Sequence, residues 1–153
     1  MKISFGKSSS SSKKNQRMVL FVCVENAGRS QMAEGFFNKC APDGYIGISA
    51  GTKPVSEINP SAIEVMKEIG IDISNQKSKE ISEDMIRNSF KTVNMGCMDK
   101  ESCPTLFLTN VLDWHLEDPK NKPIDTVREI RDEIGRRISE LVTGLTSNQS
   151  INI

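Results

Sequence analysis

A short apolar run at residues 18–22 passes directly into a polar, glycine-containing segment and then into a helical pattern. The run is continuous and rich in branched and aromatic residues, which is typical of a strand buried on both faces of a parallel sheet. From Arg29 onward the apolar residues fall at helical spacing. A buried strand, a loop and a helix in this order predict the first half of a β-α-β unit, and therefore an α/β fold.

The rest of the chain alternates between the same two patterns. An asparagine followed by a proline marks one helix start, and a long apolar stripe with charged residues on its other faces marks the last helix. The predicted strands are 45–50, 91–95 and one within 106–115, and the predicted helices are 59–70, 82–88 and 126–145. This alternation predicts a parallel sheet covered by helices.

Length and charge limit the kind of protein further. A chain of 153 residues has room for one domain, and its 20 basic residues balance 20 acidic ones, so no bulk charge indicates a nucleic-acid partner. Residues 1–17 hold five basic residues, no acidic residue and a run of serines. We therefore expect a disordered tail at 1–17, a single catalytic domain at 18–145 and a flexible tail at 146–153. No stretch has the length of a signal peptide or a membrane span, so we expect a cytoplasmic protein without a membrane partner.

The loop after the first strand carries the strongest functional signal. Residues 23–30 read Cys-Val-Glu-Asn-Ala-Gly-Arg-Ser. A loop between a parallel strand and a helix directs backbone N–H groups at one point, and the helix dipole favours an anion there. Arg29 can hold two anion oxygens in its planar fork, and the same positive field favours the Cys23 thiolate, to which Ser30 can donate its hydroxyl. The predicted anion-binding residues are Val24, Glu25, Asn26, Ala27, Gly28, Arg29 and Ser30.

The other cysteines leave several possibilities open. In a reducing compartment they are catalytic, metal-binding or inert. Cys97 and Cys103 flank a polar segment, where they serve either as redox thiols or as packed side chains. With His115 as the only histidine, they do not complete a zinc ligand set, so we predict no metal. Cys40 ends the first predicted helix and is expected to be a small buried apolar residue.

These motifs resemble the low-molecular-weight protein tyrosine phosphatases and their relatives, the thioredoxin-coupled arsenate reductases. The likeness spans about 18–145. The matching segments are 23–35, 49–52, 59–62, 70–74, 103–104, 117–119 and 131–134, together with Trp114. The resemblance implies a three-layer sandwich around a four-stranded parallel sheet.

The resemblance also implies roles for individual residues. Asp118 would be the general acid that protonates the leaving oxygen. In the reductases, Cys23 would attack arsenate and Cys97 would attack the resulting adduct, which expels arsenite and leaves a Cys23–Cys97 disulfide. Cys103 would then attack Cys97, and thioredoxin would reduce the Cys97–Cys103 pair. A phosphatase would use Cys23 and Asp118 on a phosphate ester and would need neither of the other thiols.

The surroundings of Asp118 favour the reductase over the phosphatase. The tyrosine phosphatases usually follow Asp-Pro with aromatic residues that hold the substrate ring, whereas 120–122 here read Lys-Asn-Lys. Tyr45 lies in a predicted strand, and Trp114 is expected to pack against the protein. A site without an aromatic wall suits arsenate or phosphate itself better than phosphotyrosine. A third possibility is an anion-binding module without turnover.

A cation site is the last feature that the resemblance implies. Some reductases of this family place potassium beside residues that match Asn26, Glu34 and Ser49. The acidic partner of that set falls near Ser78-Lys79, where no acid occurs. We therefore predict no cofactor, with a monovalent cation near Asn26 as the alternative, and we hypothesise that the Lys79 ammonium group takes the place of the cation.

Overall fold

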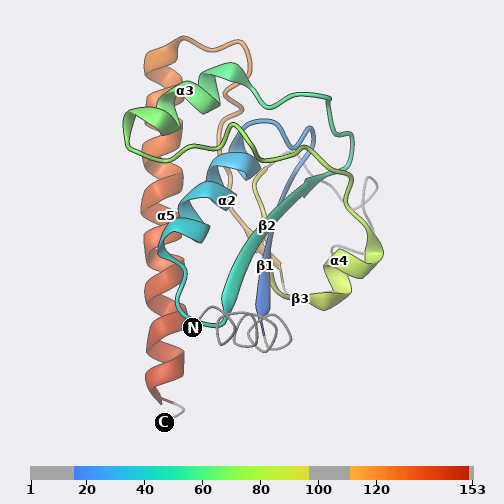
Figure 1. Cartoon of the computed structure of the whole chain (residues 1–153), viewed down its shortest axis with the longest axis vertical. Coiled ribbons are helices and arrows are strands. Elements are labelled where there is room, and N and C mark those ends of the chain that lie inside the picture. The colour runs from blue at the N-terminus through green and yellow to red at the C-terminus, as the bar shows by residue number, and fades with distance from the viewer. Residues whose placement is uncertain (1–15, 97–110, 152–153) are drawn as a thin grey trace, which may run out of the picture.

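The computed structural model describes residues 16–96 and 111–151, and a four-stranded parallel sheet forms its centre (Figure 1). Strand β1 (Arg17–Cys23) lies between β2 (Tyr45–Gly51) and β3 (Ser89–Asn94), and the short β4 (Val111–Asp113) pairs with β3. All pairings are parallel, in the order β2-β1-β3-β4. The predicted strands are confirmed, with small differences at their ends.

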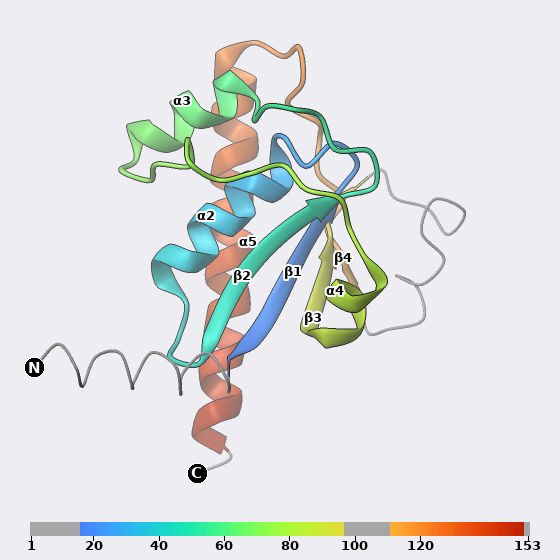
Figure 2. The same cartoon turned by 45° about the vertical axis from the view of Figure 1, so that its right-hand side comes forward.

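Helices cover both faces of this sheet (Figures 1 and 2). On one face, α2 (Arg29–Cys40) packs against β1, β2 and α5 (Ile124–Ile151), and α3 (Pro60–Glu68) packs on α5. On the other face lies α4 (Glu83–Asn88), which contacts β1 and β3. The three-layer arrangement that the sequence predicts is therefore confirmed.

The continuous apolar run of β1 is explained by burial on both faces. Because side chains alternate along a strand, Val19, Phe21 and Cys23 belong to the core under α2 and α5. Leu20 and Val22 belong to the smaller core under α4. The four apolar residues of this set are fully buried and Cys23 is 3% exposed, so one strand anchors both layers.

Side-chain caps fix the helix starts that the sequence marks. Asn59 Oδ1 accepts a hydrogen bond from the backbone N–H of Ser61 at 2.9 Å, and Pro60 is the first residue of α3. Ser82 Oγ caps α4 by accepting from the N–H of Met85 at 3.1 Å. Both caps lie at the starts of helices that the sequence predicts.

Two expectations about the ends of helices are wrong. Helix α5 continues through residue 151 instead of ending near 145, because no glycine or proline follows Gly144 to end it. Cys40 is exposed rather than buried, since it is the last residue of α2 and its thiol donates to the Phe36 carbonyl at the helix end.

The described residues include only part of the two predicted tails. Strand β1 begins at Arg17, one residue inside the predicted tail, whereas 1–15 and 152–153 lie outside the described residues. Across the part of the chain that the structure describes, no helix combines the length and the apolar character needed to cross a membrane.

The strand order determines where a site can form. From β1 the chain moves outward to β2, while β3 lies on the opposite side of β1. The connections that leave β1 and β3 therefore diverge, and a crevice opens at the carboxyl ends of these two strands. Cys23 is the last residue of β1 and lies at this crevice.

Candidate active site

Cys23 lies in a buried polar environment. Its Sγ is 2.9 Å from Ser30 Oγ, and both side chains are almost completely buried. Ser30 Oγ accepts a second hydrogen bond, from Asn26 Nδ2 at 2.8 Å. Either atom of the Cys23–Ser30 contact can be the donor, and a Cys23 thiolate, which has no proton, receives the hydroxyl proton of Ser30. The contact therefore offers a hydrogen bond to the sulfur when Cys23 acts as a nucleophile.

The backbone of the loop is oriented by its neighbour, the segment 53–59. Backbone N–H groups of that segment donate to the carbonyl oxygens of Val24, Glu25 and Ala27, at 2.8, 3.2 and 2.8 Å. The C=O and N–H of a planar trans peptide point in opposite directions, so the N–H groups that follow these carbonyls point toward the inner side of the loop. No side chain in the described part of the chain caps the N-terminus of α2. These N–H groups and the helix dipole together suit an oxyanion.

Asn26 has a left-handed backbone (φ 52°) and is fully buried, so it needs support from its surroundings. Its Oδ1 accepts from the N–H of Lys79 at 2.8 Å, and its carbonyl accepts from Gln31 Nε2 at 2.9 Å. Gln31 Nε2 also donates to the Lys77 carbonyl, and Gln76 Nε2 donates to Gln31 Oε1 at 2.8 Å. Segment 76–79 therefore holds the loop in shape. Sequence reasoning gave neither glutamine a role in the site, because the burial of Gln31 is visible only in the structure.

Arg29 is 4% exposed and is held by two backbone carbonyls. Its Nη1 donates to the carbonyl of Leu116 at 3.0 Å and to that of Met95 at 3.4 Å. Its Nη2 lies 3.6 Å from Asp118 Oδ2. Gly96 has a positive φ of 119°, and a Cβ atom there would lie 2.8 Å from Arg29 Nη1. The glycine thus allows the guanidinium group to approach the end of β3, a requirement that the sequence alone did not reveal.

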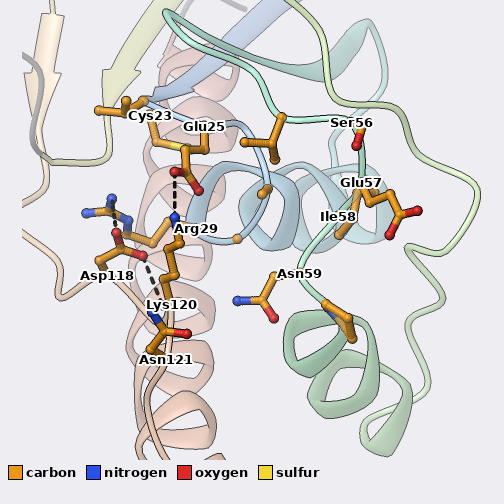
Figure 3. Close-up of a pocket in the computed structure, with 15 residues that line it drawn as sticks. Cys23, Glu25, Arg29, Ser56, Glu57, Ile58, Asn59, Asp118, Lys120 and Asn121 are labelled. Atoms are coloured by element: carbon orange, nitrogen blue, oxygen red, sulfur yellow. Dashed lines mark hydrogen bonds and ion pairs between the residues drawn. The ribbon is translucent and has the colours of Figure 1, made fainter.

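A pocket of about 540 Å³ opens over these groups (Figure 3). The anion loop and the turn 118–121 form one side of it, and segment 55–60 forms the other. The described residues that line it are Cys23, Val24, Glu25, Ala27, Gly28, Arg29, Val55, Ser56, Glu57, Ile58, Asn59, Pro60, Asp118, Lys120 and Asn121. None of them is aromatic, which agrees with the predicted lack of an aromatic wall.

The turn that carries Asp118 is tied to the anion loop. Lys120 Nζ donates to Glu25 Oε2 at 2.9 Å, and this carboxylate raises the pKa of Lys120. The N–H of Lys120 also donates to Asp118 Oδ1 at 3.0 Å. Pro119 lies against Gly28, where an added Cβ would be 2.9 Å from the proline ring. The structure thereby brings Asp118 into the same pocket as Cys23, as predicted.

Other predicted residues lie elsewhere. Trp114 is buried and packs against Phe21 with ring centroids 6.2 Å apart, so it belongs to the core and not to the pocket, as predicted. Tyr45 is buried in β2. Cys97 and Cys103 lie outside the described residues, so their predicted roles stay predictions.

Two of the residues that match the alternative cation site, Glu34 and Ser49, lie in contact with each other and close to Lys79. Ser49 Oγ donates to Glu34 Oε1 at 2.5 Å, and Lys79 Nζ lies 3.7 Å from the same oxygen. Lys79 Nζ also donates to the Lys77 carbonyl at 2.7 Å. A positively charged ammonium group therefore lies beside the Glu34 carboxylate.

A buried cysteine at the end of a parallel strand, an arginine at the start of the next helix and an aspartate beside that arginine define a cysteine-dependent enzyme that acts on oxyanions. The chain belongs to the low molecular weight phosphotyrosine protein phosphatase family, whose model matches residues 18–151.

Among its relatives, the arsenate reductase of Staphylococcus aureus (strain Newman) is 42% identical over 122 residues, which cover 78% of this chain and 91% of that protein. The solved thioredoxin-dependent arsenate reductase of Corynebacterium glutamicum is 38% identical with a TM-score of 0.73, over 87% of this chain and 63% of that one. The YwlE arginine phosphatase from Geobacillus stearothermophilus is 26% identical with a TM-score of 0.81, over 90% of this chain and 97% of that one.

Proposed function

We propose that this protein is an arsenate reductase that converts arsenate to arsenite, with Cys23 as the nucleophile and a dithiol protein of the thioredoxin type as the reductant. The observation that carries the proposal is the pocket around Cys23 and Arg29, whose described lining contains no aromatic side chain. Such a pocket fits a small tetrahedral anion and offers no ring stacking to a phosphotyrosine. The similarity to the reductases of S. aureus and C. glutamicum supports the same choice of substrate.

In the first step, the Cys23 thiolate attacks arsenic, an arsenic–sulfur bond forms and an arsenic–oxygen bond breaks. Arg29 and the loop N–H groups stabilise the negative charge on the remaining oxygens. Asp118, whose carboxyl group lies 3.6 Å from the Arg29 guanidinium group, gives its proton to the departing oxygen, which leaves as water. The oxidation state of arsenic does not change in this step.

In the second step, the Cys97 thiolate attacks Cys23 Sγ, and the electron pair of the arsenic–sulfur bond passes to arsenic, which leaves as arsenite. A Cys23–Cys97 disulfide results, so two thiols have supplied the two electrons. Cys103 then attacks Cys97 and releases Cys23 as a thiolate, and thioredoxin reduces the Cys97–Cys103 disulfide by thiol exchange. A cycle of this kind runs in a reducing compartment such as the cytoplasm.

No metal or organic cofactor takes part in this proposal. We propose that the Lys79 ammonium group supplies the positive charge beside Glu34, at the place where a monovalent cation is the alternative. The 3.7 Å separation of Lys79 Nζ from Glu34 Oε1 supports this assignment. Turnover should then be equal in potassium and sodium salts of the same ionic strength.

The proposal is tested by coupling arsenite production to thioredoxin, thioredoxin reductase and NADPH. Cys23→Ser should abolish NADPH consumption, and Cys97→Ser and Cys103→Ser should limit each enzyme molecule to one turnover or none. Cys40→Ser is the matched control, because Cys40 is exposed at the far end of α2 and should not change the rate.

The alternative is a phosphatase that acts through a phosphocysteine on Cys23. Hydrolysis of p-nitrophenyl phosphate that survives Cys97→Ser and Cys103→Ser, together with no arsenate-dependent NADPH consumption in the unaltered protein, would replace the reductase by this phosphatase. Protection against heat by phosphate without either activity would instead indicate an anion-binding module.

A further inference from the structure

We propose that Glu25 and Lys120 form a latch that positions Asp118 over the anion loop, and that neither residue takes part in the chemistry itself. Both are therefore positioning residues. The inference deepens the proposed arsenate reductase activity and rests on it.

The latch joins two segments that lie far apart in the chain. Glu25 is the second residue after the nucleophile Cys23, and Lys120 is the second residue after Asp118. Each residue of the latch is therefore two positions from a reacting group. The 2.9 Å contact between Lys120 Nζ and Glu25 Oε2 spans the two segments on the side of the pocket where Cys23 and Arg29 lie (Figure 3). Lys120 is also bonded to Asp118 itself through its backbone N–H. Movement of the lysine is thus transmitted directly to the carboxyl group.

Pro119 and Asp118 also contact the anion loop in the described part of the chain, and substrate affects these two contacts differently. Pro119 rests on Gly28 through van der Waals contact. The Asp118 carboxylate faces the Arg29 guanidinium at 3.6 Å, but an oxyanion in the loop competes for the same guanidinium group. The Glu25–Lys120 pair does not involve Arg29, so it persists when the anion is bound. Between the described residues, it is therefore a polar contact with the anion loop that keeps Asp118 in place during the reaction.

The size of the effect follows from the exposure of the pair. The side chains of Glu25 and Lys120 are 35% and 56% exposed. Pairs of this kind shift an equilibrium by a factor of roughly two to five. Loss of the latch should therefore slow the first turnover about threefold without unfolding the protein.

The direction in which each variant changes the reaction distinguishes a latch from a purely electrostatic effect of the two side chains on the bound anion. If the two side chains acted only through their charge on the anion, Glu25→Gln would strengthen and Lys120→Met would weaken arsenate binding, so the two variants would change in opposite directions. A latch predicts that both variants lose rate at saturating arsenate by the same factor. It also predicts that the double variant is no slower than either single variant.

The experiment measures arsenite released in a single turnover, without thioredoxin, by the reduced full-length chain. Lys122→Met is the matched control, because Lys122 makes a similarly exposed pair with Glu117 at 3.1 Å that does not reach the anion loop. In an Asp118→Asn background, Glu25→Gln should have no further effect, since the latch acts through Asp118. Additive losses, opposite changes in the two variants, or an equal loss in the Asp118→Asn background would overturn the proposal.

A second readout does not need arsenate turnover. The rate at which iodoacetamide alkylates Cys23, followed by peptide mass spectrometry, should rise in Glu25→Gln and Lys120→Met to the same extent, and not in Lys122→Met, because the released turn uncovers the sulfur. An unaltered protein that releases no arsenite would refute the reductase proposal but not the latch. The alkylation rate of Cys23 would then test the latch by itself. Identical alkylation rates in all variants would refute the latch.

Discussion

Replacement of Ser30 by alanine removes a hydroxyl group that makes two contacts in a fully buried position. Its Oγ lies 2.9 Å from Cys23 Sγ and accepts from Asn26 Nδ2 at 2.8 Å. The variant therefore deprives the nucleophile of a hydrogen-bond donor and leaves a buried amide N–H without its acceptor. We expect two separate consequences, one for stability and one for rate.

The stability loss comes from the amide. An unsatisfied buried donor costs about 1–3 kcal/mol, and we expect about 2 kcal/mol for Ser30→Ala. For a domain of this size, 2 kcal/mol corresponds to a decrease in Tm of about 4–8 °C. The rate loss comes from the thiolate, since a hydrogen bond to a charged group contributes about 1.5–3 kcal/mol, which is a factor of roughly 10 to 150 in the first turnover.

Thermal unfolding and single-turnover arsenite release measure the two effects on the same sample. Ser56→Ala is the control, because Ser56 also lines the pocket but lies exposed on the opposite wall. It should change Tm and rate little. A Ser30→Ala protein that unfolds and reacts like the unaltered chain would refute the assigned role of the hydroxyl group.

Three further predictions concern other parts of the molecule. Gly96→Ala should lower arsenate turnover at least tenfold, measured by NADPH consumption, because the alanine would need a positive φ and would displace Arg29, with its Cβ only 2.8 Å from Nη1. Hydrogen bonding by Arg128 lowers the pKa of Glu68 from its ordinary 4.5, so its contribution to stability is present above that pH and is lost as the pH falls through the folded-state value. The Tm difference between Glu68→Gln and the unaltered chain should therefore be largest at neutral pH and shrink as the pH falls below 4.5 through the lowered pKa of Glu68. Lys79→Ala should make turnover depend on potassium; equal rates of this variant in potassium and sodium would contradict the role given to the lysine.

Local patterns were sufficient to predict much of the fold. The apolar run of β1 is readable because both faces are buried, and the Asn59-Pro60 start of α3 is readable because a cap and a proline act within a few residues. The loop between Cys23 and Arg29 was likewise found from its place between a strand and a helix. In each of these features, the residues that determine the local structure lie within a few positions of it in the chain.

Long-range contacts and chain ends were not predictable in the same way. The support of Asn26 by segment 76–79 joins residues about fifty positions apart, and the pairing of Glu25 with Lys120 joins residues 95 positions apart. No periodicity encodes such contacts. The exposure of Cys40 depends on which turn of α2 last touches the sheet, which composition alone does not show.

The central claim is that Cys97 attacks the Cys23 sulfur of the arsenic adduct, expels arsenite and forms a disulfide that then moves to Cys97–Cys103. The most direct test adds one equivalent of arsenate to the reduced, thioredoxin-free protein and maps its cysteines by mass spectrometry. The account predicts one arsenite per chain and a Cys97–Cys103 disulfide, with Cys23 and Cys40 recovered as thiols. Four unmodified thiols after incubation, or a disulfide that involves Cys40, would contradict it.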